Sequence, residues 1–161
     1  MEKREDSELK AINEEIEKEL EASGVMPPEQ VVAMTIWGEA RGESFAGKRA
    51  VAGVIHNRAI RRSARTDIPY ILATSDVCLA PYQFSCWDHG DFVQQEPILT
   101  SSSWNECLAA ANEIFAESYV APTKATHYYA VWLNPPPKWA KKLQFVETVG
   151  DHLFFLEDGW R

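Results

Sequence analysis

Apolar residues recur at helical spacing near the start of the chain, on an otherwise charged background. The spacing is three or four positions between Leu9, Ile12, Ile16 and Leu20. This pattern predicts an amphipathic helix over residues 1–21. Ser23-Gly24 would end that helix, and Pro27-Pro28 would form a short, stiff connector. We therefore divide the chain into an N-terminal helix with its linker, residues 1–24, and a main domain, residues 25–161.

The pattern after Pro28 predicts a helix-rich α+β domain with a small β region near the C-terminus. The expected helices cover residues 29–41, 45–62 and 101–119, with a short helix over residues 138–143. β-branched and aromatic residues from Thr126 to Trp132 predict a strand. A hairpin is expected over residues 145–155, turning at Gly150-Asp151. Residues 63–100 show no sustained period, so we expect loops and short elements there.

The net charge of −8 over 161 residues excludes some partners. A protein that coats DNA or RNA needs a basic face, so a nucleic-acid role is not expected. The acidity is concentrated at the N-terminus, where residues 1–21 hold nine acidic and four basic residues. The chain has no run of about 18 apolar residues, so we expect no membrane-spanning helix.

The three cysteines, Cys78, Cys86 and Cys107, are an odd number without a close pair, which is not the pattern of a disulfide scaffold. We interpret them as small buried hydrophobic residues in a reducing compartment.

Glu39 is a candidate for chemistry because of its place in a helix. It continues the apolar stripe of Val32 and Ile36 and would therefore face the body of the protein. Desolvation favours the protonated form of such a carboxyl group, which is the form that a general acid needs. Glu43 follows four positions later and could add like-charge repulsion. The same pattern also fits a carboxylate at the surface or in a salt bridge.

Two segments combine aromatic and polar side chains. Residues 82–89 read Tyr-Gln-Phe-Ser-Cys-Trp-Asp-His, and residues 126–132 read Thr-His-Tyr-Tyr-Ala-Val-Trp. Aromatic faces beside polar groups suit sugar rings, which stack on the former and bond to the latter. A core rich in Trp and Phe is the alternative interpretation.

Three separated motifs resemble those of the SleB/CwlJ cell-wall hydrolases. The first runs from Ile36-Trp37-Gly38-Glu39-Ala40-Arg41-Gly42-Glu43 to Asn57-Arg58. The second is Gln83-Phe84-Ser85-Cys86-Trp87. The third comprises Ala125-Thr126-His127-Tyr128-Tyr129, then Trp139-Ala140, then Gly150-Asp151-His152-Leu153-Phe154-Phe155. The resemblance covers about residues 29–156, with the motifs in the right order.

This resemblance implies a lysozyme-like fold and cleavage of peptidoglycan glycan strands between N-acetylmuramic acid and N-acetylglucosamine. A lytic transglycosylase is the expected type, with no metal or other cofactor. By its position in the first motif, Glu39 would be the general acid and base, with Glu43 as the fallback. A muramidase-type hydrolase would need a second carboxylate, and Asp88 is the nearest candidate. The residues expected to bind the sugar are Gln83, Trp87, His127 and Tyr128.

Three other functions fit parts of the sequence. A thiol peptidase or amidase would use Cys86 with His89, His127 or His152. A zinc amidase would use His127, His152 and a cysteine, although no tight pair of histidines is present. A virion protein that binds the wall without cleaving it is the third alternative.

The N-terminus is too charged for a secretory signal peptide. We therefore expect a protein made in the cytoplasm that acts at the cell wall, either as a phage lysin or as part of a virion. The N-terminal helix would pack on its own chain, or bind a protein partner or a second copy.

Overall fold

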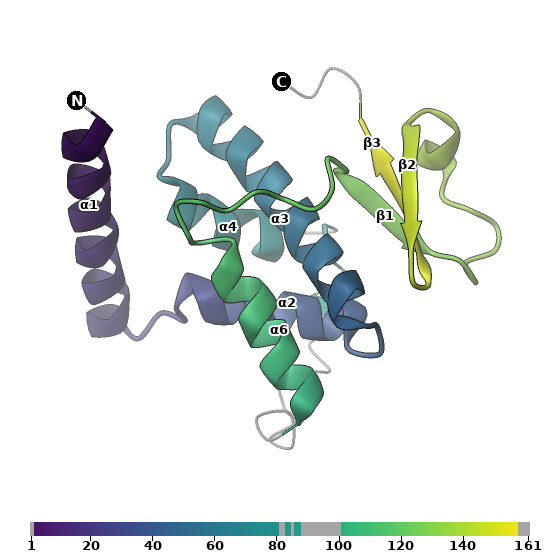
Figure 1. The fold of residues 1–161 in the computed structure, drawn as a ribbon, viewed down its shortest axis with the longest axis horizontal. Coiled ribbons are helices and arrows are strands. Elements are labelled where there is room, and N and C mark those ends of the chain that lie inside the picture. The colour runs from purple at the N-terminus through teal and green to yellow at the C-terminus, as the bar shows by residue number, and fades with distance from the viewer. Residues whose placement is uncertain (1, 81–82, 85, 88–100, 158–161) are drawn as a thin grey trace.

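The computed structural model describes residues 2–80, 83–84, 86–87 and 101–157. Figure 1 shows a helical body with a small sheet on one side and a separate N-terminal helix on the other. The helices are α1 (Glu2–Ser23), α2 (Pro28–Ala40), α3 (Phe45–Thr66), α4 (Tyr70–Leu79) and α6 (Ser102–Glu113). The predicted helix-rich α+β architecture is therefore confirmed, including the helix at the N-terminus.

Local sequence explains several helix ends. Ser44 caps α3 by accepting a hydrogen bond from the Gly47 N–H at 3.3 Å, and Ser101 caps α6 in the same way from the Trp104 N–H at 3.0 Å. Gly24 ends α1 in a left-handed conformation, φ 73°, that a residue without a Cβ adopts freely. These caps satisfy backbone groups that a helix end leaves without a partner.

The predicted helix bounds need three corrections. Helix α3 extends to Thr66 rather than residue 62, and α6 ends at Glu113, so residues 114–118 form turns instead of a last helical turn. The expectation of loops across residues 63–100 is wrong for α4, which buries Ile71, Val77 and other residues after starting behind Pro69. A ten-residue helix with several β-branched residues gives too short a pattern to show a helical period.

The C-terminal region forms a three-stranded antiparallel sheet. Its strands are β1 (His127–Ala130), β2 (Gln144–Val149) and β3 (His152–Leu156), in the order β1-β3-β2. The 3-10 helix η2 (Lys138–Lys141) precedes β2 and lies within the short helix predicted over residues 138–143. The predicted strand and hairpin are confirmed, with the turn at Gly150, φ 56°.

Alternate residues of the sheet face opposite sides. Tyr128 pairs with Phe154, and their rings, together with that of His152, contact one another on one face. On the other face, Trp139 of η2 packs edge-on against Tyr129 and Phe155. The sheet therefore has its own small aromatic cluster on the face away from Tyr128.

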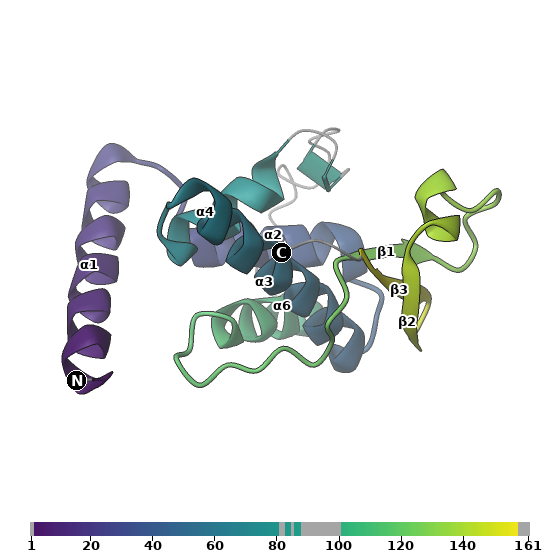
Figure 2. The ribbon, with the colours of Figure 1, turned by 90° about the horizontal axis from the view of Figure 1, so that it is seen from above.

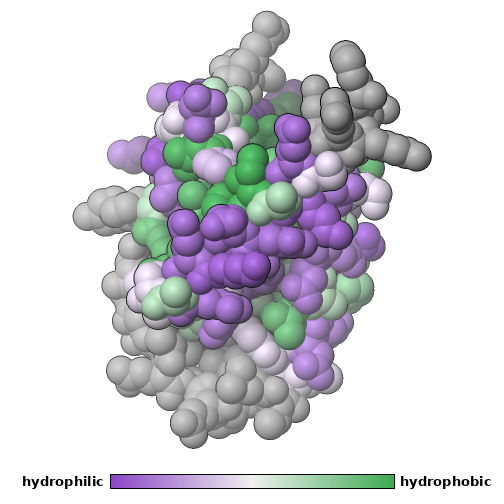
Figure 3. All heavy atoms as spheres, turned by 90° about the vertical axis from the view of Figure 1, so that its left-hand side faces the viewer, coloured by the Kyte–Doolittle hydropathy of each residue, from purple (hydrophilic) through white to green (hydrophobic). Residues whose placement is uncertain are grey.

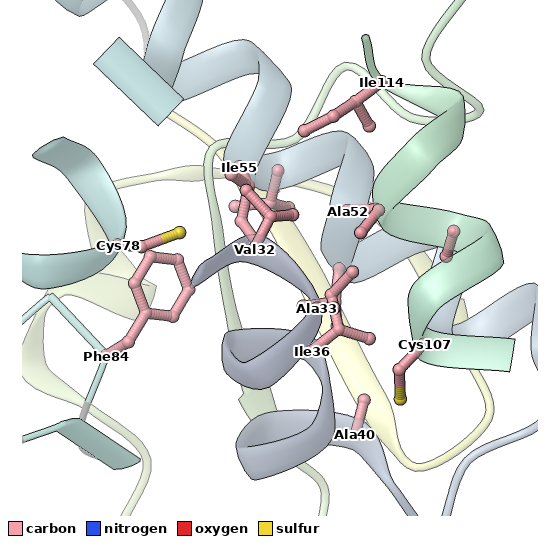
Figure 4. Close-up of a cluster of buried hydrophobic side chains, with 14 of the residues drawn as sticks. Val32, Ala33, Ile36, Ala40, Ala52, Ile55, Cys78, Phe84, Cys107 and Ile114 are labelled. Carbon is pink, nitrogen blue, oxygen red and sulfur yellow. The ribbon is translucent and has the colours of Figure 1, made fainter. Parts of the chain in front are cut away.

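Helix α2 lies at the centre of the core and packs against α3, α4 and α6. Its side chains meet those of the surrounding helices in Figure 4, where Val32 and Ile36 lie near Ile55, Cys78 and Cys107. Most of α2 is apolar and buried on more than one side, as expected for a helix surrounded by others. The last turn of this central helix carries Glu39.

Side chains of α3 hold the connector that leads into β1. Asn57 Nδ2 donates to the carbonyl oxygens of Thr123 and Ala125, both at 2.9 Å. Arg58 Nε donates to the Thr126 carbonyl at 2.7 Å. Gly53 allows the connector to come close, since a Cβ there would lie 3.2 Å from Thr123 Cγ2. The start of β1 is thus fixed relative to the helical body.

Helix α1 stands beside the body rather than within it (Figures 1 and 2). A short linker joins it to α2 at one end only. No helix in the described ranges combines the length and the apolar character needed to cross a membrane.

Replacing Ile36 with Ala should lower the free energy of unfolding by about 2–5 kcal/mol, because the side chain is fully buried and its loss leaves a cavity. Urea denaturation followed by circular dichroism measures this change. Ile60→Ala is the matched control, since Ile60 is 49% exposed and should change the same quantity by about 1 kcal/mol or less. Similar losses in the two variants would contradict the central position of α2.

Candidate functional site

Glu39 meets the sheet at its first strand. Tyr128 donates a hydrogen bond from its hydroxyl to Glu39 Oε2 at 3.0 Å. The other oxygen, Oε1, is buried, and no residue in the described part of the chain donates a hydrogen bond to it. A buried carboxylate oxygen without a partner is uncommon in proteins, and such groups often belong to functional sites. One oxygen is therefore held in place while the other is left for a different donor.

Tyr128 is suited to be a permanent donor. Burial raises the pKa of its hydroxyl well above the usual value, and the neighbouring negative charge of Glu39 raises it further. The hydroxyl thus stays protonated near neutral pH. The ring is kept in position by edge contact with His152, with 5.1 Å between ring centroids.

Arg58 brings a buried positive charge close to this pair. It lies in the middle of α3 and is 7% exposed. Burial lowers the pKa of Arg58, while the nearby Tyr128 and Glu39 act in the opposite direction. Besides its bond to Thr126, the guanidinium lies over the Phe84 ring at 5.0 Å and donates to Gln83 Oε1 at 3.4 Å. In the sequence, Arg58 was identified only as the last residue of the first motif.

Trp87 and Cys86 lie on the α2 side of the site. Trp87 Nε1 donates to Thr35 Oγ1 at 2.7 Å, so its indole edge is turned towards α2. Thr35 is fully buried, one helical turn before Glu39. For Cys86, burial is the main cause that raises the pKa of the thiol, and the negative charge of Glu39 adds to it. A nucleophilic cysteine needs the opposite shift, so this environment disfavours the thiol-peptidase alternative.

Glu43 lies just beyond the end of α2 and turns towards the hairpin. Its carboxylate accepts a hydrogen bond from the Asp151 N–H, 3.1 Å from Oε1 and 3.4 Å from Oε2. His152 Nδ1 lies 3.0 Å from Oε1, and the Glu43 side chain is only 8% exposed. The carboxylate also packs so closely on Gly150 that a Cβ there would overlap it. We call these contacts of Glu43 with Gly150, Asp151 and His152 the hairpin clamp.

The loop that carries Glu43 is itself held from two sides. Lys48 is 2% exposed, and its Nζ donates to the Glu43 carbonyl at 3.0 Å and to Glu106 Oε1 at 3.2 Å. Ser103 Oγ donates to the Arg41 carbonyl at 2.6 Å. The loop is therefore tied to α6, and the hairpin clamp connects the sheet to a fixed part of the helical body.

His127 faces away from Glu39. It neighbours Tyr128 in β1, so the two side chains lie on opposite faces of the sheet, and the His127 ring contacts Trp139. Burial, with Arg58 and Arg61 nearby, lowers the pKa of His127 to about 4. His152 contacts Tyr128 on the first face, so His127 and His152 do not converge. This separation disfavours the zinc-amidase alternative, which required both histidines at one ion.

The structure thus brings together part of the predicted site. Glu39 and Tyr128 are in contact, Gln83 accepts a hydrogen bond from the nearby Arg58, and Trp87 donates to Thr35, one turn before Glu39 in α2. Glu43 and His127 point elsewhere. Asp88 and His89, named as alternatives, lie outside the described residues.

Of the two clamp residues, Asp151 had no role assigned from the sequence, and His152 was named only in the thiol-peptidase and zinc-amidase alternatives. The signal available for them was the turn predicted at Gly150-Asp151, but a turn does not reveal which distant side chain it meets.

Comparisons with known proteins agree on one family. A family model described as Cell Wall Hydrolase matches residues 42–155, starting three residues after Glu39. The catalytic domain of the Bacillus cereus SleB protein is 26% identical, with a TM-score of 0.56 over 80% of this chain and 88% of that one. The catalytic domain of the germination-specific lytic transglycosylase SleB from Bacillus anthracis is 25% identical, with a TM-score of 0.55 over 80% and 93%. No curated protein matches the chain.

Replacing Glu43 with Gln should lower the free energy of unfolding by about 1–3 kcal/mol, because a buried acceptor loses its charge and must place an amide N–H₂ in the hairpin clamp. Chemical denaturation at neutral pH measures the change. Glu113→Gln is the matched control: its ion pair with Arg49 is solvent-exposed, so less than about 1 kcal/mol is expected. An equal loss in both variants would show that the clamp does not support the fold.

Proposed function

The chain belongs to the cell wall hydrolase family, and we propose that it cleaves peptidoglycan glycan strands as a lytic transglycosylase. The bond cleaved is the β-1,4 link between N-acetylmuramic acid and N-acetylglucosamine, with Glu39 as general acid and base. The observation that carries the proposal is the Glu39 carboxyl group, with one oxygen held by Tyr128 and the other buried without an N–H or O–H donor among the described residues. Similarity to a catalytic domain titled as a lytic transglycosylase supports it.

The reaction takes place in two proton transfers. Protonated Glu39 first gives its proton to the glycosidic oxygen, so that the bond to C1 of the muramic acid breaks and N-acetylglucosamine leaves with a free 4-hydroxyl. Glu39 then accepts the proton of the muramoyl 6-hydroxyl as that oxygen bonds to C1. The product carries a 1,6-anhydro ring, and Glu39 is protonated again. No water is consumed, and no metal is required by this chemistry.

The surroundings of Glu39 fit this cycle. Tyr128 fixes the orientation of the carboxyl group and remains a donor when Glu39 is ionised. The buried cation of Arg58 interacts favourably with the carboxylate formed between the two transfers. Both groups therefore stabilise the same intermediate state of Glu39 without taking up its second oxygen.

A single acid is sufficient for a transglycosylase, whereas most hydrolases use a second carboxylate to activate water. Glu43 is the other acidic residue of the first motif, and the hairpin clamp engages both of its oxygens. It is therefore poorly placed to activate a water molecule. This arrangement favours Glu39 over Glu43 as the acid, and it leaves the proposed transglycosylase chemistry to a single carboxyl group of the first motif.

Glu39→Gln should reduce the digestion of purified sacculi by a factor of about 10²–10⁴, the usual contribution of general acid–base catalysis. Digestion is followed as the loss of turbidity, and the products of the parent protein are identified by mass spectrometry. Glu29→Gln, at the other end of α2, is the matched control and should keep its activity. Anhydromuropeptides are expected from the parent.

Three other outcomes of this digestion would contradict different parts of the proposal. Reducing muramic acid ends without anhydro products would replace the transglycosylase with a hydrolase. Free stem peptides would overturn cleavage of the glycan. Full activity of Glu39→Gln would remove the assignment of Glu39.

Cys86→Ala should retain most of the activity on sacculi, because the raised pKa of this thiol keeps it protonated and unreactive near neutral pH. The same turbidity assay measures it, with circular dichroism to verify that the variant is folded. Loss of activity in folded Cys86→Ala, with Glu39→Gln still active, would instead support a thiol-dependent peptidase or amidase.

A further inference from the structure

A groove of about 770 Å³ separates α1 from the helical body. Leu9, Asn13 and Glu17 line it from α1, and His56, Tyr70 and Tyr119 line it from the body. The groove lies on the side of the body opposite the sheet, where α1 stands alone in Figures 1 and 2. Since the family match starts at residue 42, α1 lies outside the matched residues.

The apolar stripe of α1 is only partly covered by its own chain. Leu9 is 53% exposed and Ile12 is 50% exposed, whereas Ile16 and Leu20 are partly buried. Ile60 of α3, on the opposite wall of the groove, is 49% exposed. Seen from the α1 side, hydrophilic side chains cover most of the face, with smaller hydrophobic patches among them (Figure 3). Apolar surface is thus available on both walls.

The wall on the body is an ordered, uncharged aromatic surface. Tyr70 donates its hydroxyl proton to the Ile114 carbonyl at 2.9 Å, so it accepts from His56 Nδ1 at 2.7 Å. The His56 ring stands edge-on to Tyr119, with 4.8 Å between centroids. Burial lowers the pKa of His56 and raises that of Tyr119 to about 12, so both are neutral near pH 7. The Tyr119 hydroxyl is buried, and no residue in the described ranges hydrogen-bonds to it.

The rim of the groove is acidic. The carboxylates along it are those of Glu14, Glu17, Glu29 and Glu117, against one cation, Lys10. None of these four carboxylates is in an ion pair with another residue of the described part of the chain. Glu17 and Glu29 lie close together. Burial is the main cause that raises the pKa of Glu17, and the Glu29 carboxyl group raises it further. Cationic side chains placed here would relieve this repulsion.

We propose that this groove binds an amphipathic helix of another protein, with apolar residues on one side and Lys or Arg beside them. The apolar side of that helix would contact the α1 stripe and the aromatic wall, and its cations would pair with the acidic rim. A second copy of this chain is a poor occupant, because its own helix carries nine acidic and four basic residues over residues 1–21. Binding at this groove is independent of the chemistry at Glu39.

The test uses the full chain and a defined probe, a fluorescein-labelled 18-residue amphipathic helix of leucine and lysine. Fluorescence anisotropy should show binding that weakens as salt is added. A peptide with glutamate in place of lysine should not bind. The double variant Glu14→Lys with Glu17→Lys should lose at least tenfold in affinity. The matched control is Glu15→Lys with Glu19→Lys, which changes the charge equally on exposed positions of α1 outside the groove and should keep its affinity.

Several results would overturn the proposal. Failure of the lysine peptide to bind, or equal losses in the two double variants, would show that the groove does not select a basic helix. Sedimentation showing a dimer that Leu9→Ser dissociates would assign the groove to a second copy. Digestion of sacculi by Glu14→Lys with Glu17→Lys, followed in parallel, should match that of the parent, which separates this test from that of the proposed function.

Discussion

The hairpin clamp is the interaction on which the position of the sheet depends. A carboxylate as little exposed as that of Glu43 would be costly without a partner; the Asp151 N–H donates a hydrogen bond to it, and His152 Nδ1 lies 3.0 Å from Oε1. Gly150 allows the approach, since any larger residue would meet the carboxylate. Burial of the Glu43 carboxylate is therefore favourable only when the β2–β3 turn lies against the loop after α2.

This constraint reaches Glu39 through the sheet. Fixing His152 fixes the ring that contacts Tyr128, and Tyr128 in turn donates to Glu39. Arg58 acts on the same strand from the other end, through its bond to the Thr126 carbonyl. Glu39 and Glu43 are four residues apart, yet they have different tasks: the end of α2 at Ala40 separates them, so that one meets β1 and the other meets the hairpin turn.

Sequence periodicity predicted the elements that are long or strongly patterned, such as α2, α3 and the hairpin, and missed α4, which is too short for a clear period. The site shows a similar limit. The stripe of α2 made Glu39 a candidate and the family resemblance gave it a role, but its contact with Tyr128 joins residues 89 positions apart, which no local pattern encodes. His127 was grouped with Tyr128 because they are adjacent, although strand geometry places adjacent side chains on opposite faces. Glu43 was considered as a source of like-charge repulsion on Glu39, but α2 ends at Ala40, between the two residues.

Charge is distributed differently at the groove beside α1 and around Glu39. The acidity that dominates the composition belongs largely to α1 and to the rim of its groove, on the far side of the body from the sheet. Around Glu39 the balance differs, because the buried Arg58 supplies a cation and Tyr128 supplies a neutral donor. For the proposed cleavage of peptidoglycan, this arrangement places most of the charge that would repel an anionic polymer on a helix away from the sheet that contacts Glu39. The partner proposed for the groove would bind on that same side, opposite the sheet, where its cations meet the acidic rim and not Glu39.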